Sequence, residues 1–546
     1  MSGVSTAPSF TPCFTKILAK RGFTDPEAID QFLSADLSGL EDPLKMKGLS
    51  AAVGRIQQAI RQGEKILIHG DYDADGITAT AILGRTLNLL KADFATFLPE
   101  RTRDGYGVSE SAIRDARKLG TSLLITVDCG IAAHHEIQVA CGLGMDVIVI
   151  DHHKIPAEGL PGTSMILNPQ QTDCDYPFQG LTAAGLVFKL SQGLIENRVF
   201  RFLDLVALSV VSDVAPLVGE NRILVKQGLK SIGETPNLGL QALAAVSGIR
   251  GKTMNVGHLG FILGPRINAC GRMSTPDIAL RLLMTENRKE AESLAHVLDE
   301  ENKMRQREER QTLREAIWDV EHTVNFNRER ILVVARDGWH QGVVGIVASR
   351  LAEKYHRPAI VIALEGDSGK GSGRSIRKFD LFRALQASGD VLEEFGGHEL
   401  AAGLVVKKEN LAEFRERINR YAQQEYSSDV FVKEVPVDLE LSLSDFHSDF
   451  IQELKRLEPH GVGNPRPVFL TRGLEIKAKK TPAHAHSLQF WVTDGILTYE
   501  AVWQNRTGDG MPDLATGKTV DLFYTVKTRV WDGMESLVLE VKDIVQ

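Results

Sequence analysis

Short apolar runs, separated by stretches with helical spacing, begin at Lys65. Runs of this length, bounded by glycine and separated by helices, are typical of parallel strands in a doubly wound α/β sheet. The run 202–217 predicts a helix or a buried segment that ends near Asp213. Three runs predict buried strands: KILIHG (65–70), SLLITVDCG (122–130) and MDVIVIDHH (145–153).

The pattern changes several times along the chain, which indicates several domains. A mostly helical lead-in comes first, and the α/β domain follows it. A charged stretch without proline or glycine predicts long connecting helices, a second α/β domain comes next, and alternating short strands at the end predict a β-barrel. The predicted boundaries are 1–50, 51–282, 283–325, 326–427 and 428–546.

Composition narrows the class of protein. The 546 residues are 43% hydrophobic and 25% charged, as in ordinary globular proteins, and carry a formal net charge of −8. That charge argues against non-specific coating of nucleic acid but leaves room for a local basic groove. The five cysteines form no C-x-x-C pair, so we expect a reducing cytoplasm and neither disulfides nor a zinc ribbon. We see no signal peptide and no membrane span.

Candidate chemistry begins at HGDYDADG (69–76), directly after the first predicted strand. His69, Asp71, Asp73 and Asp75 alternate along an extended segment, so they can share one side. Carboxylates held together repel one another unless a cation lies between them. Mixed Asp and His ligands suit Mn²⁺ well and Mg²⁺ less well, and zinc is a further option.

Other acidic and histidine residues follow later apolar runs: Asp128, Asp151, His152, His153 and Asp213. Strand ends of an open α/β sheet gather ligands at one edge, so we expect these clusters to converge. Each cluster has a simpler alternative. The D-x-D-x-D run suits a solvated loop or a calcium loop, although no Glu completes an EF-hand. Asp128 suits a helix N-cap, and a lone histidine suits a core hydrogen bond.

Several motifs resemble those of known enzymes. DYDADG, VDCG, DHH and SDVAPL are similar to the successive motifs of the DHH phosphoesterase superfamily. The resemblance to the RecJ family within it extends over nearly the full chain. It rests on NPQQTDCDYPF (168–178), GPRINACGRM (264–273), GKGSGRSI (369–376), FGGHELAAG (395–403) and EPHGVGNPRPVF (458–469).

The resemblance implies a fold, an activity and a metal site. The fold is a DHH domain, connecting helices, a DHH-associated domain and a C-terminal OB-fold. The activity is single-strand-specific 5′→3′ DNA exonuclease action that releases 5′-mononucleotides in recombination and repair. Two divalent ions, Mn²⁺ before Mg²⁺, are implied. His69, Asp73 and Asp128 would hold one ion. Asp75, Asp128, His152 and Asp213 would hold the other. His153 would support them or polarise the phosphate, and Asp71 is a further candidate.

The segment GSGRSIRKF (371–379) combines glycines, hydroxyls and guanidinium groups, which suit a phosphate, although a surface turn is the commoner explanation of such a string. The resemblance implies that Ser372 and Arg374 bind the 5′-phosphate. Arg101 would join them, with Arg103 as the alternative. Further expected DNA contacts are Arg272, His398 and Tyr106. The simpler role of His398 is a structural hydrogen bond, and that of Tyr106 is packing.

The predicted barrel contains two groups of residues suited to single strands. Candidate platforms for base stacking are Trp491, Trp503 and Trp531. Each of these side chains could equally belong to the hydrophobic core of the barrel. A basic stripe is expected from Arg466, Arg472, Lys477, Lys479 and Lys480.

Two other hypotheses stay open at this point. One keeps the metal site but changes the substrate to pyrophosphate, short RNA or a cyclic dinucleotide, and the barrel argues against it. The other is a non-catalytic DNA-binding relative, and the full set of candidate ligands argues against that. Expected partners are single-stranded DNA with a 5′ end, a helicase and a single-strand-binding protein. We expect a monomer and no membrane.

Overall fold

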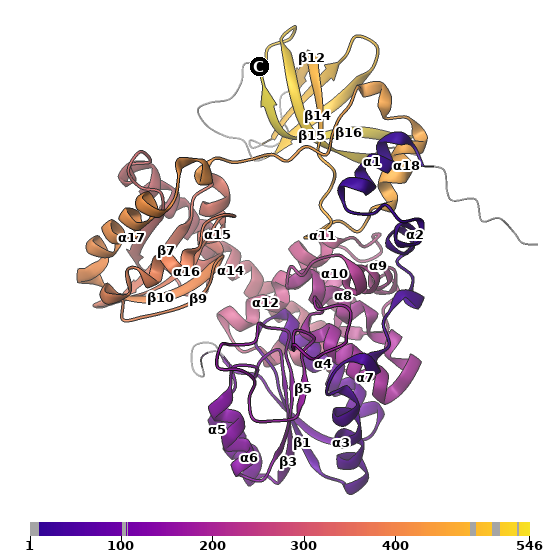
Figure 1. The fold of residues 1–546 in the computed structure, drawn as a ribbon, viewed down its shortest axis with the longest axis vertical. Helices are drawn as coiled ribbons and strands as arrows, with labels where there is room; N and C mark the ends of the chain where they lie inside the picture. The colour runs from indigo at the N-terminus through magenta and orange to yellow at the C-terminus, as the bar shows by residue number, and fades with distance from the viewer. Residues whose placement is uncertain (1–9, 101–104, 106, 481–486, 505–513, 532–533) are drawn as a thin grey trace, which may run out of the picture.

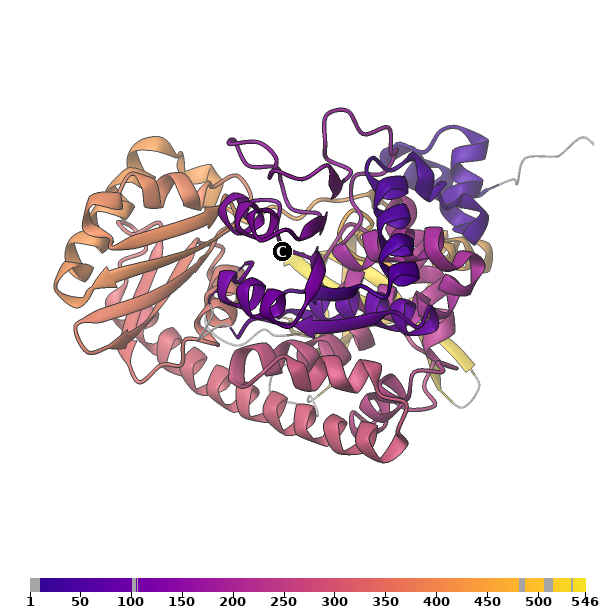
Figure 2. The ribbon, with the colours of Figure 1, turned by 90° about the horizontal axis from the view of Figure 1, so that it is seen from below.

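The computed structural model describes residues 10–100, 105, 107–480, 487–504, 514–531 and 534–546. Figure 1 shows the first α/β domain at the bottom, the second α/β domain at the left and a β-domain at the top. The 36-residue helix α14 (Arg288–Thr323) leads from the first domain to the second and is seen along its length in Figure 2. Among the described residues, none of the helices combines the length and hydropathy that a membrane crossing requires.

The sheet of the first domain is parallel throughout, with strand order β2-β1-β3-β4-β5. Strand succession reverses beside β1, so the carboxyl ends of β1 and β3 border a topological switch point, where open α/β sheets bind ligands. This confirms the predicted doubly wound class. The strands are β1 (Lys65–His69), β2 (Asp93–Phe97), β3 (Thr121–Val127), β4 (Asp146–Ile150) and β5 (Met165–Leu167).

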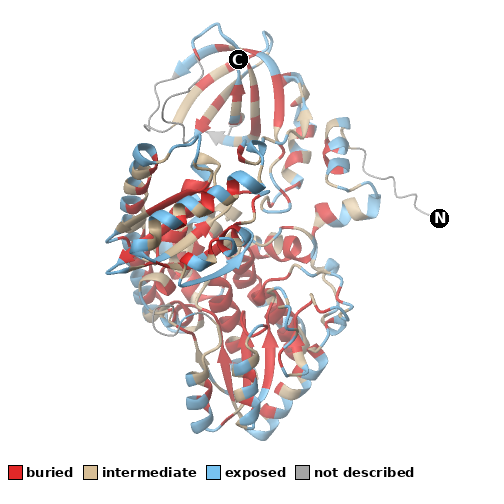
Figure 3. Ribbon diagram, turned by 60° about the vertical axis from the view of Figure 1, so that its left-hand side comes forward, coloured by how far each residue is buried: buried red, intermediate tan, exposed pale blue. Residues whose placement is uncertain are grey.

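Helices cover both faces of this sheet, because neighbouring residues of each strand point to opposite sides. Ile66 and Ile68 belong to the core shared with α3, α4 and α7, whereas Leu67 belongs to the core shared with α5 and α6. Figure 3 shows the central strands of the sheet as mostly buried, whereas the edge strand β2 has no buried residue. The helices are α3 (Leu49–Gln62), α4 (Ala74–Leu89), α5 (Glu110–Lys118), α6 (His134–Gly142) and α7 (Ala183–Ile195).

A helical layer completes the first domain. The run 202–217 forms the end of η3 and α8, and Asp213 is the C-cap of α8, so the helical alternative is confirmed. The segments are η3 (Glu196–Phe202), α8 (Leu203–Ser212), α9 (Gly219–Ile232), α10 (Leu238–Val246), α11 (Val256–His258), the π-helix η4 (Leu259–Leu263), α12 (Gly264–Met273) and α13 (Asp277–Met284).

The second α/β domain has a mixed sheet in the order β6-β7-β8-β10-β9, in which only β6 and β7 are parallel. The end of α14 packs with α15 on one face, and α16 and α17 pack on the other. The elements are β6 (Leu332–Asp337), α15 (Val344–Tyr355), β7 (Ala359–Glu365), β8 (Ser368–Arg374), α16 (Leu381–Gln386), η5 (Gly389–Val391), β9 (Glu394–His398), β10 (Ala401–Lys407), η6 (Lys408–Asn410) and α17 (Leu411–Glu425).

The C-terminal domain is a closed barrel, as predicted. Its sheet runs β11-β12-β13-β14-β16-β15, and a further β12–β15 pairing closes it. The elements are η7 (Ser428–Phe431), β11 (Leu439–Glu440), η8 (Leu443–Asp445), α18 (Ser448–Arg456), β12 (Phe469–Lys480), β13 (Ser487–Thr493), β14 (Thr498–Gln504), β15 (Thr519–Trp531) and β16 (Met534–Val545).

The N-terminal lead-in is helical as expected, and its first two helices pack on the C-terminal domain (Figure 1). Phe14 and Phe32 lie in one core with Phe450 and Phe469. The backbone N–H of Thr11 donates to Glu453 Oε1 at 2.9 Å. The two ends of the chain therefore share a core. The elements are α1 (Pro12–Lys20), α2 (Pro26–Ser34), η1 (Leu37–Gly39) and η2 (Pro43–Lys45).

Candidate metal centre and nucleic-acid pocket

The loop between β1 and α4 is held by a side-chain cap and by close backbone packing. Asp73 is the N-cap of α4, and its Oδ1 accepts from the N–H groups of Asp75 at 2.9 Å and Gly76 at 3.1 Å. A Cβ at Gly76 would lie 2.6 Å from the carbonyl oxygen of Asp71, so only glycine permits this close turn. The aspartates of the loop are thus brought to the positive end of a helix, which favours carboxylates.

Asp75 is anchored to a second helix. Its Oδ2 accepts from the N–H of Ala183 at 2.8 Å, and its Oδ1 accepts from the N–H of Ala184 at 2.9 Å, both in the first turn of α7. The hydroxyl of Ser209 on α8 donates to Oδ1 at 2.6 Å. These hydrogen bonds fix the orientation of a carboxylate that is almost wholly buried.

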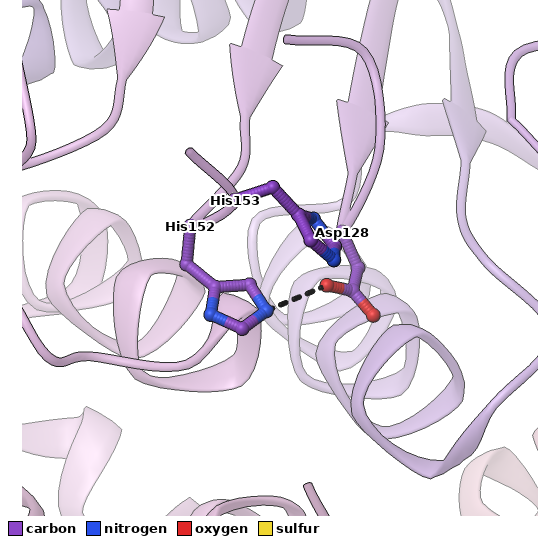
Figure 4. A group of neighbouring side chains, drawn as sticks. All are labelled: Asp128, His152 and His153. Carbon is purple, nitrogen blue, oxygen red and sulfur yellow. Dashed lines mark ion pairs between the residues drawn. The ribbon is translucent and has the colours of Figure 1, made fainter. Parts of the chain in front are cut away.

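Asp128 follows β3 with a left-handed backbone, φ 63°, which is strained for most residues other than glycine. Its N–H donates to the carbonyl of Ile150 at 2.9 Å, and this contact holds the turn. Its Oδ1 lies 3.2 Å from Nε2 of His152 (Figure 4), and the same nitrogen lies 3.6 Å from Asp75 Oδ2. Backbone strain of this kind is common at functional sites.

His153 is oriented by Asp151 at the end of β4. Asp151 Oδ1 accepts from Nδ1 of His153 at 2.7 Å and from its backbone N–H at 3.0 Å, and Oδ2 accepts from the N–H of Ile131 at 2.9 Å. Burial by itself would lower the pKa of His153, but the hydrogen bond and charge of Asp151, together with Asp213 and Asp75, raise it to about 9. The surrounding carboxylates therefore favour the protonated form of the His153 ring.

Three overlapping groups of side chains converge here, each with ligand atoms within 4.8 Å of one another. Two groups share Asp128, and two share His152. They lie at the carboxyl ends of β1, β3 and β4 and at the end of α8, as the strand-end argument predicts. The groups are Asp71, Asp73 and Asp128; Asp75, His152 and Asp213; and Asp128, His152 and His153.

The electrostatics of this cluster fit divalent cations. Burial and the charge of Asp73 raise the pKa of Asp71 to about 8. Burial and the charges of Asp75 and Asp73 raise the pKa of Asp213 to about 8 and that of Asp128 well above its ordinary value. Asp71 Oδ1 and Asp128 Oδ1 are buried and accept no hydrogen bond from the described residues, although Asp128 Oδ1 has the ion-pair contact with His152. Oxygen atoms left in this state suit cation ligands.

The structure places His69 outside these three groups. Its Nε2 accepts from the N–H of Ser109 at 3.0 Å, and its Nδ1 lies 3.8 Å from Cys129 Sγ. His69 thus anchors the segment before α5, whereas Asp71, the lesser candidate from the sequence, joins Asp73 and Asp128.

Sequence reasoning missed the residues that support the cluster. Ser209 and the N-terminus of α7 hold Asp75, and Asn268 Oδ1 accepts from the N–H of Ala74 at 2.8 Å. A Cβ at Gly271 would lie 2.6 Å from the carbonyl oxygen of Tyr72. Asn268 and Gly271 both fall in the motif 264–273, so the sequence marked them as notable. It did not show that this motif contacts the aspartate loop.

Three of the predicted DNA-binding residues line one cavity of about 950 Å³: Arg272, Ser372 and Arg374. Nη1 of Arg374 donates to Ser372 Oγ at 3.0 Å, and a Cβ at Gly345 would lie 3.0 Å from the same hydroxyl. Arg272 reaches across from α12 and donates to the carbonyl of Gly342 at 3.1 Å. The cavity therefore joins the two α/β domains.

The other predicted contacts lie elsewhere. His398 ends the exposed edge strand β9 and is not part of the cavity lining, although its register partner Ala401 also pairs with Arg374. Arg101, Arg103 and Tyr106 fall outside the described residues.

In the barrel, Trp503 is buried, so it belongs to the core, whereas Trp491 is half-buried. Arg472 forms ion pairs with Glu440 and Asp521, and Lys477 pairs with Glu475. Arg466 lies 3.8 Å from Glu540. Lys479 is exposed. The side chains of Lys480 and Trp531 fall outside the described residues.

Known proteins share this architecture. The chain matches family models described as the DHH family N-terminal domain (residues 65–210), the DHHA1 domain (328–424) and the RecJ OB domain (437–543). The single-stranded-DNA-specific exonuclease RecJ of Bacillus subtilis is 38% identical over 536 residues, which cover 98% of this chain and 68% of that protein.

Two crystal structures of RecJ from Thermus thermophilus are similar along the whole chain. The complex with Mn²⁺ gives a TM-score of 0.84 at 31% identity and covers 98% of this chain and 76% of that one. The complex with Mg²⁺ gives a TM-score of 0.78 at 30% identity and covers 98% of this chain and 75% of that one. The chain is thus similar to one relative solved in complex with each of the two divalent ions.

Proposed function

This chain belongs to the RecJ family of single-stranded-DNA-specific exonucleases, and from that premise we propose that it degrades single strands from the 5′ end and releases 5′-mononucleotides. The observation that carries the proposal is the convergence of five aspartates and two histidines into overlapping groups beside a cavity lined with arginine and serine. This combination suits hydrolysis of a phosphodiester near a bound terminal phosphate.

We propose two adjacent cation sites. One is formed by Asp71, Asp73 and Asp128, and the other by Asp75, His152 and Asp213, with Asp128 shared between them. The preference is Mn²⁺ before Mg²⁺, because an imidazole ligand suits the softer ion. When bound, the two ions would neutralise charge on the scissile phosphate and lower the pKa of the attacking water.

The protein's own groups orient the substrate at this cluster. Protonated His153, held by Asp151, can donate from Nε2 to a non-bridging oxygen of the scissile phosphate. The positive charge of the ring favours the more negative transition state over the ground state. Because Asp75 is fixed by two helix N–H groups and a hydroxyl, little rearrangement is needed when substrate arrives.

The direction of cleavage follows from the cavity beside the cluster. Arg374 and Ser372 supply donors suited to a terminal phosphate, and Arg272 supplies a cation from the first domain. A bound 5′-phosphate sets which phosphodiester reaches the carboxylates. We propose that Arg101 and Tyr106 also contact the DNA and that His398 contacts a neighbouring phosphate from β9.

The cellular setting is also part of the proposal. All five cysteines are free thiols, which supports a reducing cytoplasm. We propose a monomer that acts on strands opened by a helicase, beside a single-strand-binding protein.

The test uses 5′-phosphorylated single strands, blunt duplex and a cyclic dinucleotide, each with Mn²⁺ or EDTA. We expect Mn²⁺-dependent release of mononucleotides from the single strand alone, and loss of cleavage in Asp128→Ala with much of the DNA binding retained. Preferential hydrolysis of the cyclic dinucleotide would assign the site to a different phosphodiesterase. Mn²⁺-dependent cleavage by purified Asp128→Ala would overturn the metal assignment.

A further inference from the structure

An aromatic ring projects from the π-helix η4 (Leu259–Leu263), between α11 and α12. Phe261 is 82% exposed, while Leu259 and Leu263 at the ends of the same turn are buried. A Cβ at Gly260 would lie 3.2 Å from Val211 Cγ1, so this turn sits close against α8. π-Helical turns are rare and often found at functional sites. The core therefore holds the two leucines and leaves the phenyl ring to solvent.

Phe261 lies where two cavities meet. One, of about 450 Å³, is bordered by α12, α14 and α15. The other, of about 840 Å³, lies between the first domain and the C-terminal domain. The smaller cavity also shares Arg272 with the cavity that holds Ser372 and Arg374. Three hollows thus follow one another from the candidate 5′-phosphate pocket to the barrel, with Arg272 at one junction and Phe261 at the other.

The hollows on both sides of Phe261 are cationic. In the smaller one, Arg305 and Arg350 share the carboxylate of Glu309, and Arg350 also lies 3.9 Å from Glu353. Arg310 has no ion pair among the described residues. Its wall also includes Asn268, which hydrogen-bonds to the aspartate loop. In the larger one, Arg466 and Lys527 share the carboxylate of Glu540. With Lys226 and Lys455, these basic residues outnumber Glu458 and Glu540.

We propose that Phe261 is a stacking platform for a base of the single strand as it passes from the metal cluster to the barrel. The inference rests on the proposed function. A flat apolar ring between two cationic hollows matches a strand, in which bases alternate with phosphates. Stacking on an aromatic ring tolerates any base, as a sequence-independent exonuclease requires. Apolar residues such as Met254 and Val256 also line the larger cavity, but the basic residues in the lining of both hollows favour a polyanionic strand over an apolar protein segment.

Because of the position of the ring, the stacking contact with Phe261 depends on the length of the DNA strand. A dinucleotide bound at the phosphate pocket ends near the cluster, whereas a long strand continues past Arg272 toward Phe261. The platform therefore holds the 3′ portion of the strand and strengthens binding only of substrates that reach it. Stacking on one aromatic ring corresponds to roughly a tenfold change in affinity.

The experiment compares kcat/KM for a 5′-phosphorylated 20-mer with kcat/KM for a dinucleotide in the full-length Mn²⁺-loaded enzyme. We expect Phe261→Ala to lower the 20-mer to dinucleotide ratio by roughly tenfold, mainly through KM of the 20-mer, and Phe261→Trp to preserve it. The control is Trp318→Ala, which removes another aromatic ring, 54% exposed, that lines none of the three cavities.

A second readout locates the contact directly. Strands carrying 2-aminopurine at successive positions are bound to the Asp128→Ala enzyme, which leaves them uncut. The 2-aminopurine fluorescence should be quenched at one interior position of the strand. In the double variant Asp128→Ala/Phe261→Ala, this quenching should be relieved. If wild-type enzyme cleaves the 20-mer but the ratio is the same in Phe261→Ala, the platform is refuted while the proposed function stands. If wild-type enzyme cleaves no single strand, the proposed function itself fails. An equal effect of Trp318→Ala would also refute the platform.

Discussion

The backbone N–H of Leu217 donates to the carbonyl of Val462 at 2.7 Å. Leu217 follows Asp213 by four residues, and Val462 belongs to the loop 458–464 before the C-terminal barrel. Arg222 reinforces this junction, because its buried guanidinium donates to the carbonyls of Arg456, Leu457, Glu458 and Pro459. The loop of one domain thus supports the segment that carries a candidate metal ligand in another.

A bulky residue in this loop should weaken the metal site. A Cβ at Gly461 would lie 2.7 Å from Leu217 Cδ1, so Gly461→Val must displace Leu217 and shift the chain toward Asp213. We expect the Mn²⁺ concentration for half-maximal cleavage to rise about tenfold, as when a residue that supports a metal ligand is removed. A Mn²⁺ titration of activity measures this. Gly142→Val is the control, since a Cβ at Gly142 meets nothing within 4 Å. Equal titration curves for Gly461→Val and wild type would show that the loop has no influence on the site.

Stability without metal should fall as pH rises. Burial and neighbouring charges raise the folded pKa of Asp71 and Asp213 from 3.8 to about 8. Between these values the folded state binds more protons than the unfolded state, so stability declines with increasing pH and the loss is complete above about 8. In EDTA we expect Tm at pH 8 to be lower than at pH 5.5 by about 3 °C or more.

Added Mn²⁺ should remove most of that difference, because it binds the folded carboxylates. Asp128→Asn should raise Tm in EDTA at pH 8 while it abolishes cleavage, since it removes one of the repelling charges. Thermal melts at both pH values measure these effects. A metal-free Tm that rises from pH 5.5 to pH 8 would contradict the electrostatic account of the cluster.

Asp71 and His69 offer a direct comparison of two candidate ligands for the first cation. Asp71 Oδ1 is buried beside Asp73 and Asp128, whereas His69 Nε2 accepts from the N–H of Ser109. We expect Asp71→Asn to raise the Mn²⁺ requirement by at least about tenfold and His69→Gln, which keeps a hydrogen-bond acceptor, to raise it less. Calorimetric titration with Mn²⁺ measures both. The reverse order would restore His69 to the ligand set implied by the family resemblance.

Loss of the phosphate donors should reduce the preference for phosphorylated ends. In Ser372→Ala/Arg374→Ala, we expect the ratio of kcat/KM for 5′-phosphorylated over 5′-hydroxyl strands to fall about 10- to 100-fold, the effect of removing one or two charge-assisted hydrogen bonds. Lys378→Ala is the control, because Lys378 pairs with Glu434 outside the cavity. An unchanged ratio would place the 5′-phosphate elsewhere.

Much of the fold could be predicted because the residue pattern of a strand is visible within its own segment of the sequence. The apolar runs that end at His69, Val127 and Ile150 became β1, β3 and β4, and the polar residues after them met at one edge. The long charged stretch became the single helix α14. These are properties of spacing and burial, which each segment expresses by itself.

Contacts between distant segments could not be predicted. Nothing near Phe14 shows that it packs with Phe450, and nothing near Arg272 shows that it lines a cavity with Ser372. The exposure of Phe261 could not be predicted either, because an apolar residue in an apolar run is expected to be buried.

The sequence by itself determined the class of fold, the family and the set of carboxylates and imidazoles from which a metal site can be built. Only the tertiary structure decided which of them meet. Side chains two residues apart can point into different surroundings, so Asp71 entered the cluster while His69 turned to Ser109. Alternation along an extended segment predicts a shared side, but burial, neighbouring charge and the available hydrogen-bond donors select the atoms that face one another.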